Sequence, residues 1–265
     1  MTAPYALITG GSSGIGEAFA HQLARRGWPL IIVSNRREEN RRVAALIGQR
    51  YGVDVQQLTL DLCRPEAAEE LVAWLDGWNL EVGLLVSNAG MLQFSTLQHT
   101  SCERIRELVA LHCNTPSQLC RLLGERMAQK RRGYILLVSS LTAWMPYPTI
   151  SLYAATKGYL KLFGEALWHE MRPKGVQVTT LFPSAVDTPL YPLEERIRHR
   201  LLRWGVMLTA ERVAEAGVKA LLKGRHRSLP GFWCKLFAGI AWLMPAHLLT
   251  PILKLPRVKA ILDRV

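Results

Sequence analysis

The sequence predicts an α/β fold in which a parallel β-sheet carries helices on both faces, the doubly wound arrangement. Short runs rich in Val, Ile and Leu alternate with longer amphipathic segments from the start of the chain to about Phe182, as strands and helices do in parallel sheets. A glycine-rich turn follows the first run, and polar residues follow several others. Ligands in such folds bind at the carboxyl ends of the strands, so we expect these residues to share one site.

The first predicted unit is a strand, a glycine-rich turn, a helix and a second strand. Strand Tyr5–Thr9 leads into the turn 10–16, and Gly27 ends the helix before strand Leu30–Val33. Glycines allow a tight turn and a close backbone approach, and the N-terminus of a helix attracts a pyrophosphate. Taken alone, such a turn is also compatible with an ordinary loop.

The alternation continues, and Asp61, Asn88, Ser140 and Pro183 stand at or just beyond the ends of later runs. The further predicted strands are Val55–Thr59, Leu84–Ser87, Tyr134–Val138 and Val176–Phe182, and the further helices run from Pro65 toward Trp78, over about 101–127, and from near Ser151.

Composition suits one large globular domain. The chain has 265 residues, of which 49% are hydrophobic and 20% are charged. We expect a main domain over residues 1–230 and a basic, apolar extension over 231–265. The five cysteines are scattered without a metal-binding spacing, which predicts reduced thiols, no metal site and a cytoplasmic location. The first strand begins within ten residues of the start, which predicts no signal peptide.

The positive charge is concentrated in the last quarter of the chain. Residues 1–189 hold 19 Lys and Arg against 16 Asp and Glu, whereas residues 190–265 hold 14 against 5. An even excess would favour general affinity for nucleic acid. An excess beside an apolar tail favours an anionic membrane surface or an anionic substrate.

Tyr153 and Lys157 are four residues apart on a predicted helix and therefore share one face. A phenol has an ordinary pKa of about 10, and a neighbouring ammonium lowers it. Tyr153 is thus a candidate general acid and base, and Ser140, at the end of the preceding strand, could hold the substrate oxygen. The alternative is a helix face with a half-buried tyrosine and a solvated lysine.

Together these residues resemble the classical short-chain dehydrogenase/reductase family over about residues 4–190. The resemblance rests on the turn Thr9–Gly16, on Asn88-Ala89-Gly90, on Asn114, Ser140, Tyr153 and Lys157 as a catalytic tetrad, and on Pro183 to Val186 with Thr188. Ser87 and Ser184 stand where the family commonly has Asn and Gly. The resemblance implies a Rossmann-type catalytic domain, a nicotinamide-dependent oxidoreductase, and a homodimer or homotetramer.

The resemblance also implies a role for each member of the tetrad. Tyr153 would donate the proton during reduction, and Lys157 would lower its pKa and bind the nicotinamide ribose. Ser140 would hydrogen-bond the carbonyl oxygen, and Asn114 would hold a water that links Lys157 to solvent. For Asn114, a side chain that bonds its own helix backbone is the alternative.

Residues after the second strand favour NADP as the cofactor. NAD enzymes place an acid near this point to bind the ribose hydroxyls, but here Arg36 and Arg37 precede the first acid, Glu38. Their guanidinium groups suit a 2′-phosphate, although a solvated basic helix start is the alternative. The predicted cofactor-binding residues are Gly10, Ser12, Ser13, Gly14, Ile15, Gly16, Asn35, Arg36, Arg37, Asp61, Leu62, Asn88, Ala89, Gly90, Tyr153, Lys157, Pro183, Val186 and Thr188.

Large apolar and aromatic residues follow the later strands and are candidates for a substrate pocket. Met91, Trp144, Tyr147 and Tyr191 are the principal ones. They suit an apolar carbonyl or alcohol, such as a lipid, a sterol or an acyl group. Core or interface packing is the alternative.

The tail combines apolar and basic residues. Helices are predicted at Pro192–Trp204 and Thr209–Lys223, with a short strand at Arg225–Leu229. Leu236–Leu253 has no charged residue over 18 positions, close to the minimum for a bilayer span, but Pro245 and other breakers favour a helix lying in the membrane plane. Packing on the domain or on a partner subunit is the alternative.

Three function classes remain in competition. The first is an NADP-dependent oxidoreductase acting on an apolar ketone or alcohol, cytoplasmic or peripheral on a membrane. The second is a cofactor-binding regulator of the same fold, which usually lacks the tyrosine or the lysine that this chain keeps. Charge alone suggests the third, a nucleic-acid binder, and we expect no nucleic-acid partner.

Overall fold

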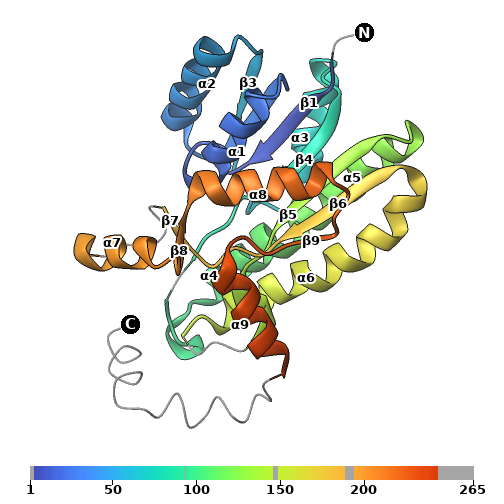
Figure 1. The fold of residues 1–265 in the computed structure, drawn as a ribbon. Coiled ribbons are helices and arrows are strands. Elements are labelled where there is room, and N and C mark those ends of the chain that lie inside the picture. Colours follow the sequence, from blue (N-terminus) through green and yellow to red (C-terminus); the bar gives the residue numbers. More distant parts are fainter. Residues whose placement is uncertain (1–2, 93, 146–148, 189–193, 244–265) are drawn as a thin grey trace, which may run out of the picture.

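The computed structural model describes residues 3–92, 94–145, 149–188 and 194–243 and confirms the doubly wound α/β fold (Figure 1). Its seven-stranded sheet has the order β3-β2-β1-β4-β5-β6-β9, and every pairing is parallel. The strands are β1 (Tyr5–Thr9), β2 (Leu30–Ser34), β3 (Val55–Thr59), β4 (Val82–Ser87), β5 (Gly133–Val138), β6 (Val176–Leu181) and β9 (Arg227–Ser228). The strand order reverses between β1 and β4, which is where open parallel sheets bind ligands.

Helices cover both faces of the sheet. One face packs against α1 (Gly14–Ala24), α2 (Arg37–Tyr51) and α8 (Ala210–Leu222). The other packs against α3 (Ala67–Gly77), α5 (Thr115–Gln129) and α6 (Ser151–Met171). Each helix therefore contributes an apolar stripe to one of two cores.

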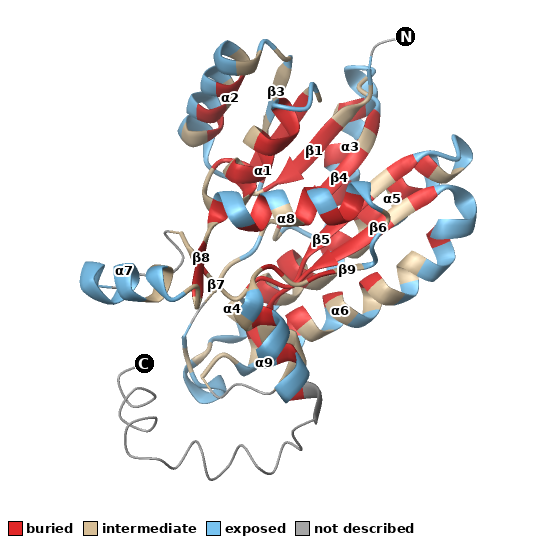
Figure 2. Ribbon diagram, viewed as in Figure 1, coloured by how far each residue is buried: buried red, intermediate tan, exposed pale blue. Residues whose placement is uncertain are grey.

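Alternation along the central strands divides the side chains between these two cores. Ile8 and Ile32 belong to the α1 side, whereas Leu7 and Ile31 belong to the α3 side, and all four side chains are fully buried. Because both faces of the sheet are covered, most residues of the central strands are buried, as Figure 2 shows, and most of these buried residues are apolar.

The helix predicted over 101–127 is interrupted. It consists of α4 (Cys102–Val109), a π-helical segment η2 (Ala110–Asn114) and α5. Pro116 lies in the first turn of α5. A proline has no N–H to donate and clashes with the carbonyl four residues before it, here that of His112, so the regular hydrogen-bond ladder breaks at this point.

The region after β6 also differs from the prediction. A small parallel pair, β7 (Ala185–Asp187) with β8 (Met207–Thr209), was not predicted because three-residue strands carry too little pattern. Within the described residues, the arginine-rich helix is α7 (Glu195–Arg203) and the last strand is only Arg227–Ser228. The start of the predicted helix at Pro192 lies outside the described residues.

The described part of the extension is one helix, α9 (Phe232–Leu243). It packs beside the short helix η3 (Leu141–Trp144). The remainder of the predicted apolar stretch, with Met244 and Pro245, lies outside the described residues. Within the ranges that the structure describes, no helix is both long enough and apolar enough to cross a bilayer.

Candidate active site

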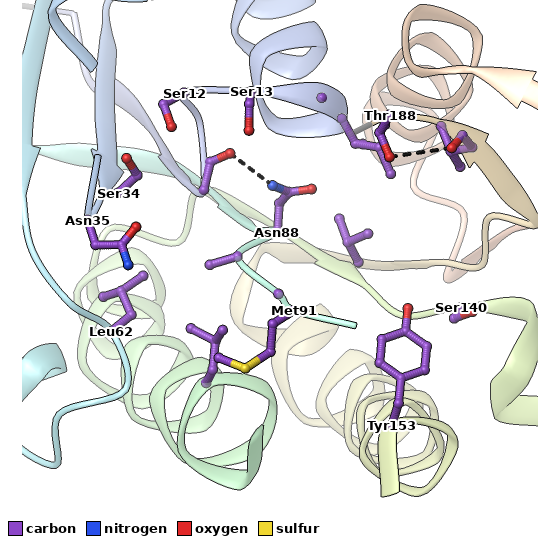
Figure 3. Close-up of a pocket in the computed structure, with 18 of the residues that line it drawn as sticks. Ser12, Ser13, Ser34, Asn35, Leu62, Asn88, Met91, Ser140, Tyr153 and Thr188 are labelled. Atoms are coloured by element: carbon purple, nitrogen blue, oxygen red, sulfur yellow. Dashed lines mark hydrogen bonds between the residues drawn. The ribbon is translucent and has the colours of Figure 1, made fainter. Parts of the chain in front are cut away.

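A cavity of about 460 Å³ opens at the carboxyl ends of the strands around β1 and β4 (Figure 3). Most of the residues predicted to form the site line it together. These are Gly10, Ser12, Ser13, Gly14, Ile15, Asn35, Arg36, Asp61, Leu62, Asn88, Ala89, Gly90, Met91, Ser140, Tyr153, Lys157, Pro183, Val186 and Thr188.

Other predicted residues do not line the cavity. Gly16, Arg37, Asn114 and Trp144 lie outside it. Trp144 packs edge-on against Phe182, with 5.5 Å between the ring centroids. Tyr147 and Tyr191 lie outside the described residues.

The glycine-rich turn is held against the end of β4. The Asn88 side-chain amide donates to the carbonyl oxygens of Thr9 (3.0 Å) and Gly10 (3.3 Å), and the Thr9 hydroxyl accepts from the backbone N–H groups of Asn88 (2.9 Å) and Ala89 (3.0 Å). Gly10 has a φ of +64°, and a Cβ there would lie 2.9 Å from the Ala89 Cα. The turn therefore needs glycine at this position.

Gly16 shapes the site without lining it. A Cβ at Gly16 would lie 1.9 Å from the Gly10 carbonyl oxygen, so only glycine lets α1 approach the turn this closely. Helix α1 begins at Gly14, and its N-cap Ser13 forms no side-chain capping bond within the described ranges. The first N–H groups of α1 thus point toward the cavity without that partner, as in an anion-binding helix terminus.

Tyr153 and Lys157 are both buried, with 9% and 4% of their surfaces exposed. The alternative of a solvated lysine is therefore wrong. The Lys157 ammonium donates to the Val138 carbonyl oxygen (3.0 Å) and lies 5.6 Å from the centre of the Tyr153 ring. Burial lowers the pKa of Lys157 to about 8, so at neutral pH the ammonium form still predominates.

Two neighbouring serines connect the end of β5 to this pair. The Ser139 hydroxyl donates to the Lys157 carbonyl oxygen at 2.7 Å and so anchors α6. The Ser140 hydroxyl accepts from the Thr142 backbone N–H at 3.2 Å and caps η3. Its proton is not used in that bond, and Figure 3 shows the Tyr153 ring directed toward the part of the cavity where Ser140 lies.

Sequence reasoning missed His112, which lies fully buried beside Tyr153. Its Nε2 atom accepts from the Met91 backbone N–H (3.1 Å), and its Nδ1 atom lies 2.9 Å from the Thr156 hydroxyl oxygen. That hydroxyl donates to the Tyr153 carbonyl oxygen (2.8 Å), so the geometry fits a neutral ring with the proton on Nδ1. Burial, and then the nearby charges of Lys157 and Arg104, hold the pKa of His112 well below its usual value.

Asn114 occupies the end of the π-helical segment, where its side chain is exposed. Its proposed water-holding role stays a prediction. Segments of this type occur frequently at functional sites, and this one also carries His112. The segment is the signal that could have drawn attention to His112, but it cannot be seen in the sequence.

The cavity extends to the start of α2. Arg36 lines it and donates its backbone N–H to the Ser34 hydroxyl at 3.1 Å, and Arg37 is the first residue of the helix. Both side chains are exposed, and neither guanidinium forms an ion pair with any residue that the structure describes. Two positive charges without an ion-pair partner at the positive end of a helix dipole favour an anion there, although Glu38 and Glu39 follow in the same turn.

Several residues that line the cavity were not in the predicted set of site residues. They are Ser34, Leu60, Cys63, Arg104, Leu111, Val138, Ser139 and Ser184. Burial, followed by the nearby Asp61 carboxylate, raises the pKa of the Cys63 thiol to about 11. The Cys63 thiol in the cavity lining therefore stays protonated and unreactive.

Relatives of known function resemble this chain over most of its length. The mouse 17-beta-hydroxysteroid dehydrogenase type 3 is 34% identical over 188 residues, covering 70% of this chain and 61% of the relative. The mouse very-long-chain 3-oxoacyl-CoA reductase is 29% identical over 199 residues, covering 72% and 62%. The chain thus spans about three fifths of the length of these curated relatives.

Solved structures share the fold. A short-chain dehydrogenase from Sphingobium yanoikuyae in complex with NADPH aligns with a TM-score of 0.76 at 27% identity, covering 85% of this chain and 87% of the other. A bulky-bulky ketone specific alcohol dehydrogenase from Comamonas testosteroni aligns with a TM-score of 0.77 at 26% identity, covering 92% and 94%. Residues 4–196 also match the family model described as short chain dehydrogenase. With that match, the fold and the cavity at its switch point, the chain belongs to the short-chain dehydrogenase family.

Proposed function

We propose that this protein is an NADP-dependent oxidoreductase that interconverts a carbonyl and an alcohol on an apolar substrate, with Tyr153 as general acid and base. The observation that carries the proposal is the convergence of Tyr153, Lys157 and Ser140 in the same cavity as the glycine-rich turn. A catalytic domain at residues 1–230 with an extension at 231–265, assembled as a homodimer or homotetramer, completes the proposal.

The residues present fit a phosphorylated dinucleotide. The start of α1, which has no side-chain cap, and glycines of the turn line the cavity and would receive the pyrophosphate. A side chain at Gly14 would meet Thr188 at 3.1 Å, so glycine keeps this part of the turn open. Asp61 and Leu62 would contact the adenine. Pro183 and Val186, at the other end of the cavity, would border the nicotinamide, which supplies the hydride when the cofactor is bound.

Arg36 and Arg37 support NADP rather than NAD. Arg36 lines the cavity and Arg37 follows it at the start of α2. Both guanidinium groups are exposed and form no ion pair with a residue that the structure describes, and bidentate donors suit a ribose 2′-phosphate. Two solved relatives carry the phosphorylated cofactor: the Sphingobium yanoikuyae enzyme is complexed with NADPH, and an alcohol dehydrogenase from Thermococcus sibiricus is complexed with 5-hydroxy-NADP.

In the reductive direction, the Tyr153 phenol would give its proton to the carbonyl oxygen. The Lys157 ammonium, fixed by the Val138 carbonyl oxygen at 3.0 Å, stabilises the resulting phenolate. The Ser140 hydroxyl proton would point at the same substrate oxygen and stabilise its developing charge. Burial of Tyr153 and Lys157 strengthens both interactions because water is excluded.

An apolar, bulky carbonyl compound is the substrate class that we propose. The relatives are named for steroids, very-long-chain 3-oxoacyl-CoA and bulky ketones. Met91, Leu111 and Val186 provide apolar walls to the cavity. Of the predicted substrate-side residues, Met91 lines the cavity, and Trp144, Tyr147 and Tyr191 stay predictions.

NADPH oxidation with a panel of carbonyl compounds tests this function. The panel should contain a 17-ketosteroid, a long-chain 3-oxoacyl thioester, a bulky aryl ketone and a small polar ketone. We expect turnover that favours the apolar members and NADPH over NADH. Tight NADPH binding with no turnover on any member would instead favour the non-catalytic regulator.

A further inference from the structure

Helix α9 buries three small side chains and exposes four large apolar ones. Cys234, Ala238 and Ala241 are buried. The exposed side chains are Phe232 (69%), Leu236 (40%), Phe237 (39%) and Ile240 (39%). Proteins rarely leave several large apolar side chains exposed together unless that surface binds something.

The C-terminal end of helix α7 is tied to helix α9 by a hydrogen bond. The Trp233 indole N–H donates to the Trp204 carbonyl oxygen at 2.8 Å, which ties the residue after α7 to the first turn of α9. Ile197 and Trp204 are 45% and 59% exposed and, with Leu201, recur at the spacing of one helix face. We call the exposed residues Ile197, Trp204, Phe232, Leu236, Phe237 and Ile240 the α7–α9 face; Figure 2 shows how exposed both helices are.

Positive charge borders the α7–α9 face. Arg196, Arg200 and Arg203 recur at the same spacing and form a stripe beside the apolar one on α7. All three are exposed, and none forms an ion pair with a residue that the structure describes. Lys235 adds a charge on α9, and the sequence beyond it continues with Lys254, Arg257, Lys259 and Arg264 against Asp263.

The positive charge distinguishes between two candidate partners for the α7–α9 face, a second copy of the chain and a membrane surface. A second copy of the chain, joined through the same face by two-fold symmetry, would place three arginines from each copy in or beside one interface, and their like charges disfavour that pairing. A bilayer with a negatively charged surface over an apolar interior would match both the arginines and the apolar side chains of the face. Amphipathic helices with aromatic residues on one side and basic residues on the other bind membrane interfaces in this way.

We propose that the α7–α9 face docks on the surface of an anionic lipid bilayer, with the aromatic and aliphatic side chains inserted at the headgroup boundary and the arginines on lipid phosphates. The face is connected to the cavity, because Ser184, which lines the cavity, donates to the Val206 carbonyl oxygen just after α7 (3.2 Å). Docking would thus bring the cavity near apolar substrates dissolved in the bilayer. Only this delivery step rests on the proposed function.

Vesicle sedimentation of the full chain tests the docking. Vesicles of phosphatidylcholine with phosphatidylglycerol should bind the protein at low salt and release it as salt rises, and pure phosphatidylcholine should bind it weakly. The variant Arg196→Gln/Arg200→Gln/Arg203→Gln should bind roughly tenfold more weakly or worse. The matched control Arg25→Gln/Arg50→Gln/Arg132→Gln removes equal charge at the opposite edge of the sheet and should bind within about twofold of the parent.

A second variant tests the apolar part. Phe232→Ser/Leu236→Ser/Ile240→Ser should lose vesicle binding while its thermal midpoint and NADPH binding stay close to those of the parent. If this variant does not fold, the comparison of vesicle binding between the two arginine variants still tests the docking proposal. Vesicle binding does not require turnover, so failure of the proposed function and failure of docking are distinguishable.

Three outcomes would overturn the proposal. The first is no vesicle binding at any salt concentration. The second is equal weakening in both arginine variants, which would mean attraction by net charge alone. The third is a dimer in solution that the serine variant converts to a monomer without vesicle binding by the parent, which would make a second copy the occupant.

Discussion

The Nε2 atom of His112 accepts a hydrogen bond from the backbone N–H of Met91 at 3.1 Å, and this bond fixes the loop after β4 beside Tyr153. The other side of the same ring reaches the Tyr153 carbonyl oxygen through the Thr156 hydroxyl. His112 does not line the cavity, so we regard it as a positioning residue that couples the turn Asn88–Gly90 to helix α6.

Replacing His112 should therefore impair catalysis more than cofactor capture. His112→Leu leaves the Met91 N–H buried without its acceptor, which costs about 1–3 kcal/mol of folding stability. We expect kcat to fall roughly tenfold or more, in line with misplacement of a catalytic group. His112→Gln offers an amide oxygen near the Nε2 position and should recover part of kcat. Equal loss of stability in both variants with kcat unchanged would mean a merely structural role.

The stability of the protein in mild acid should also depend on His112. Its pKa lies well below 6.5 in the folded protein because burial penalises the charged ring. The unfolded chain takes up a proton near pH 6.5 and the folded chain does not, so stability is fully present above that pH and is lost as the pH falls toward the folded pKa, by at most about 1.4 kcal/mol per pH unit.

Urea unfolding between pH 7.5 and 5 measures this effect. His112→Gln should flatten the acid slope relative to the parent. The pKa values of His21 and His226 are also lowered by burial. Both residues remain in the variant, so their effects on the acid slope cancel when the two proteins are compared. Identical slopes in the two proteins would contradict the assignment of a neutral, buried His112.

Much of the fold and the site could be predicted because the signals are local. The turn Thr9–Gly16 and the pair Tyr153 and Lys157 each lie within one turn or one helix, where spacing alone sets relative position. Strand and helix alternation then brings the strand ends to one edge. The prediction of a parallel, doubly wound sheet is confirmed for this reason.

The features that escaped prediction depend on contacts between distant segments. His112 is recognisable only from its bonds to Met91 and Thr156, which lie 21 and 44 residues away. The π-helical segment that presents it appears as ordinary helix in the sequence. The packing of α9 also depends on distant contacts: its buried side carries Cys234, Ala238 and Ala241, and the helix packs beside η3.

Tyr153→Phe tests the chemical step. The change removes the phenol proton and keeps the ring, which packs edge-on with His112 at 5.6 Å between centroids. Loss of general acid catalysis should lower kcat on the order of 10²–10⁴-fold, with little change in NADPH affinity measured by fluorescence titration. A variant that turns over at the parent rate would remove Tyr153 from the mechanism.

Arg36→Ala/Arg37→Ala tests cofactor choice. Only NADPH has the 2′-phosphate that these guanidinium groups would bind, so KM for NADPH should rise roughly tenfold or more while KM for NADH changes little. Arg41→Ala/Arg42→Ala is a matched control, since both residues lie further along α2 and pair with Glu38 and Glu17. Equal losses with both cofactors would point to a disturbed turn instead of a lost phosphate contact.

Lys157 should make the stability of the folded protein rise with pH in the alkaline range, with the same sign as the effect of His112 in acid. Burial lowers its pKa from 10.5 to about 8 in the folded protein, so folding carries a penalty while the ammonium is protonated. The penalty is full below pH 8 and is relieved as the pH rises toward 10.5, where the unfolded chain also loses the proton. Without cofactor, the parent should therefore gain stability relative to Lys157→Met between pH 7 and 10, up to on the order of 3 kcal/mol.

The lost bond to the Val138 carbonyl oxygen changes the unfolding free energy of Lys157→Met by a constant amount and does not alter its slope with pH. Parallel stability curves for the two proteins would show that the ammonium is not desolvated, and the strengthening of the Lys157–Tyr153 interaction by burial would then lose its physical basis.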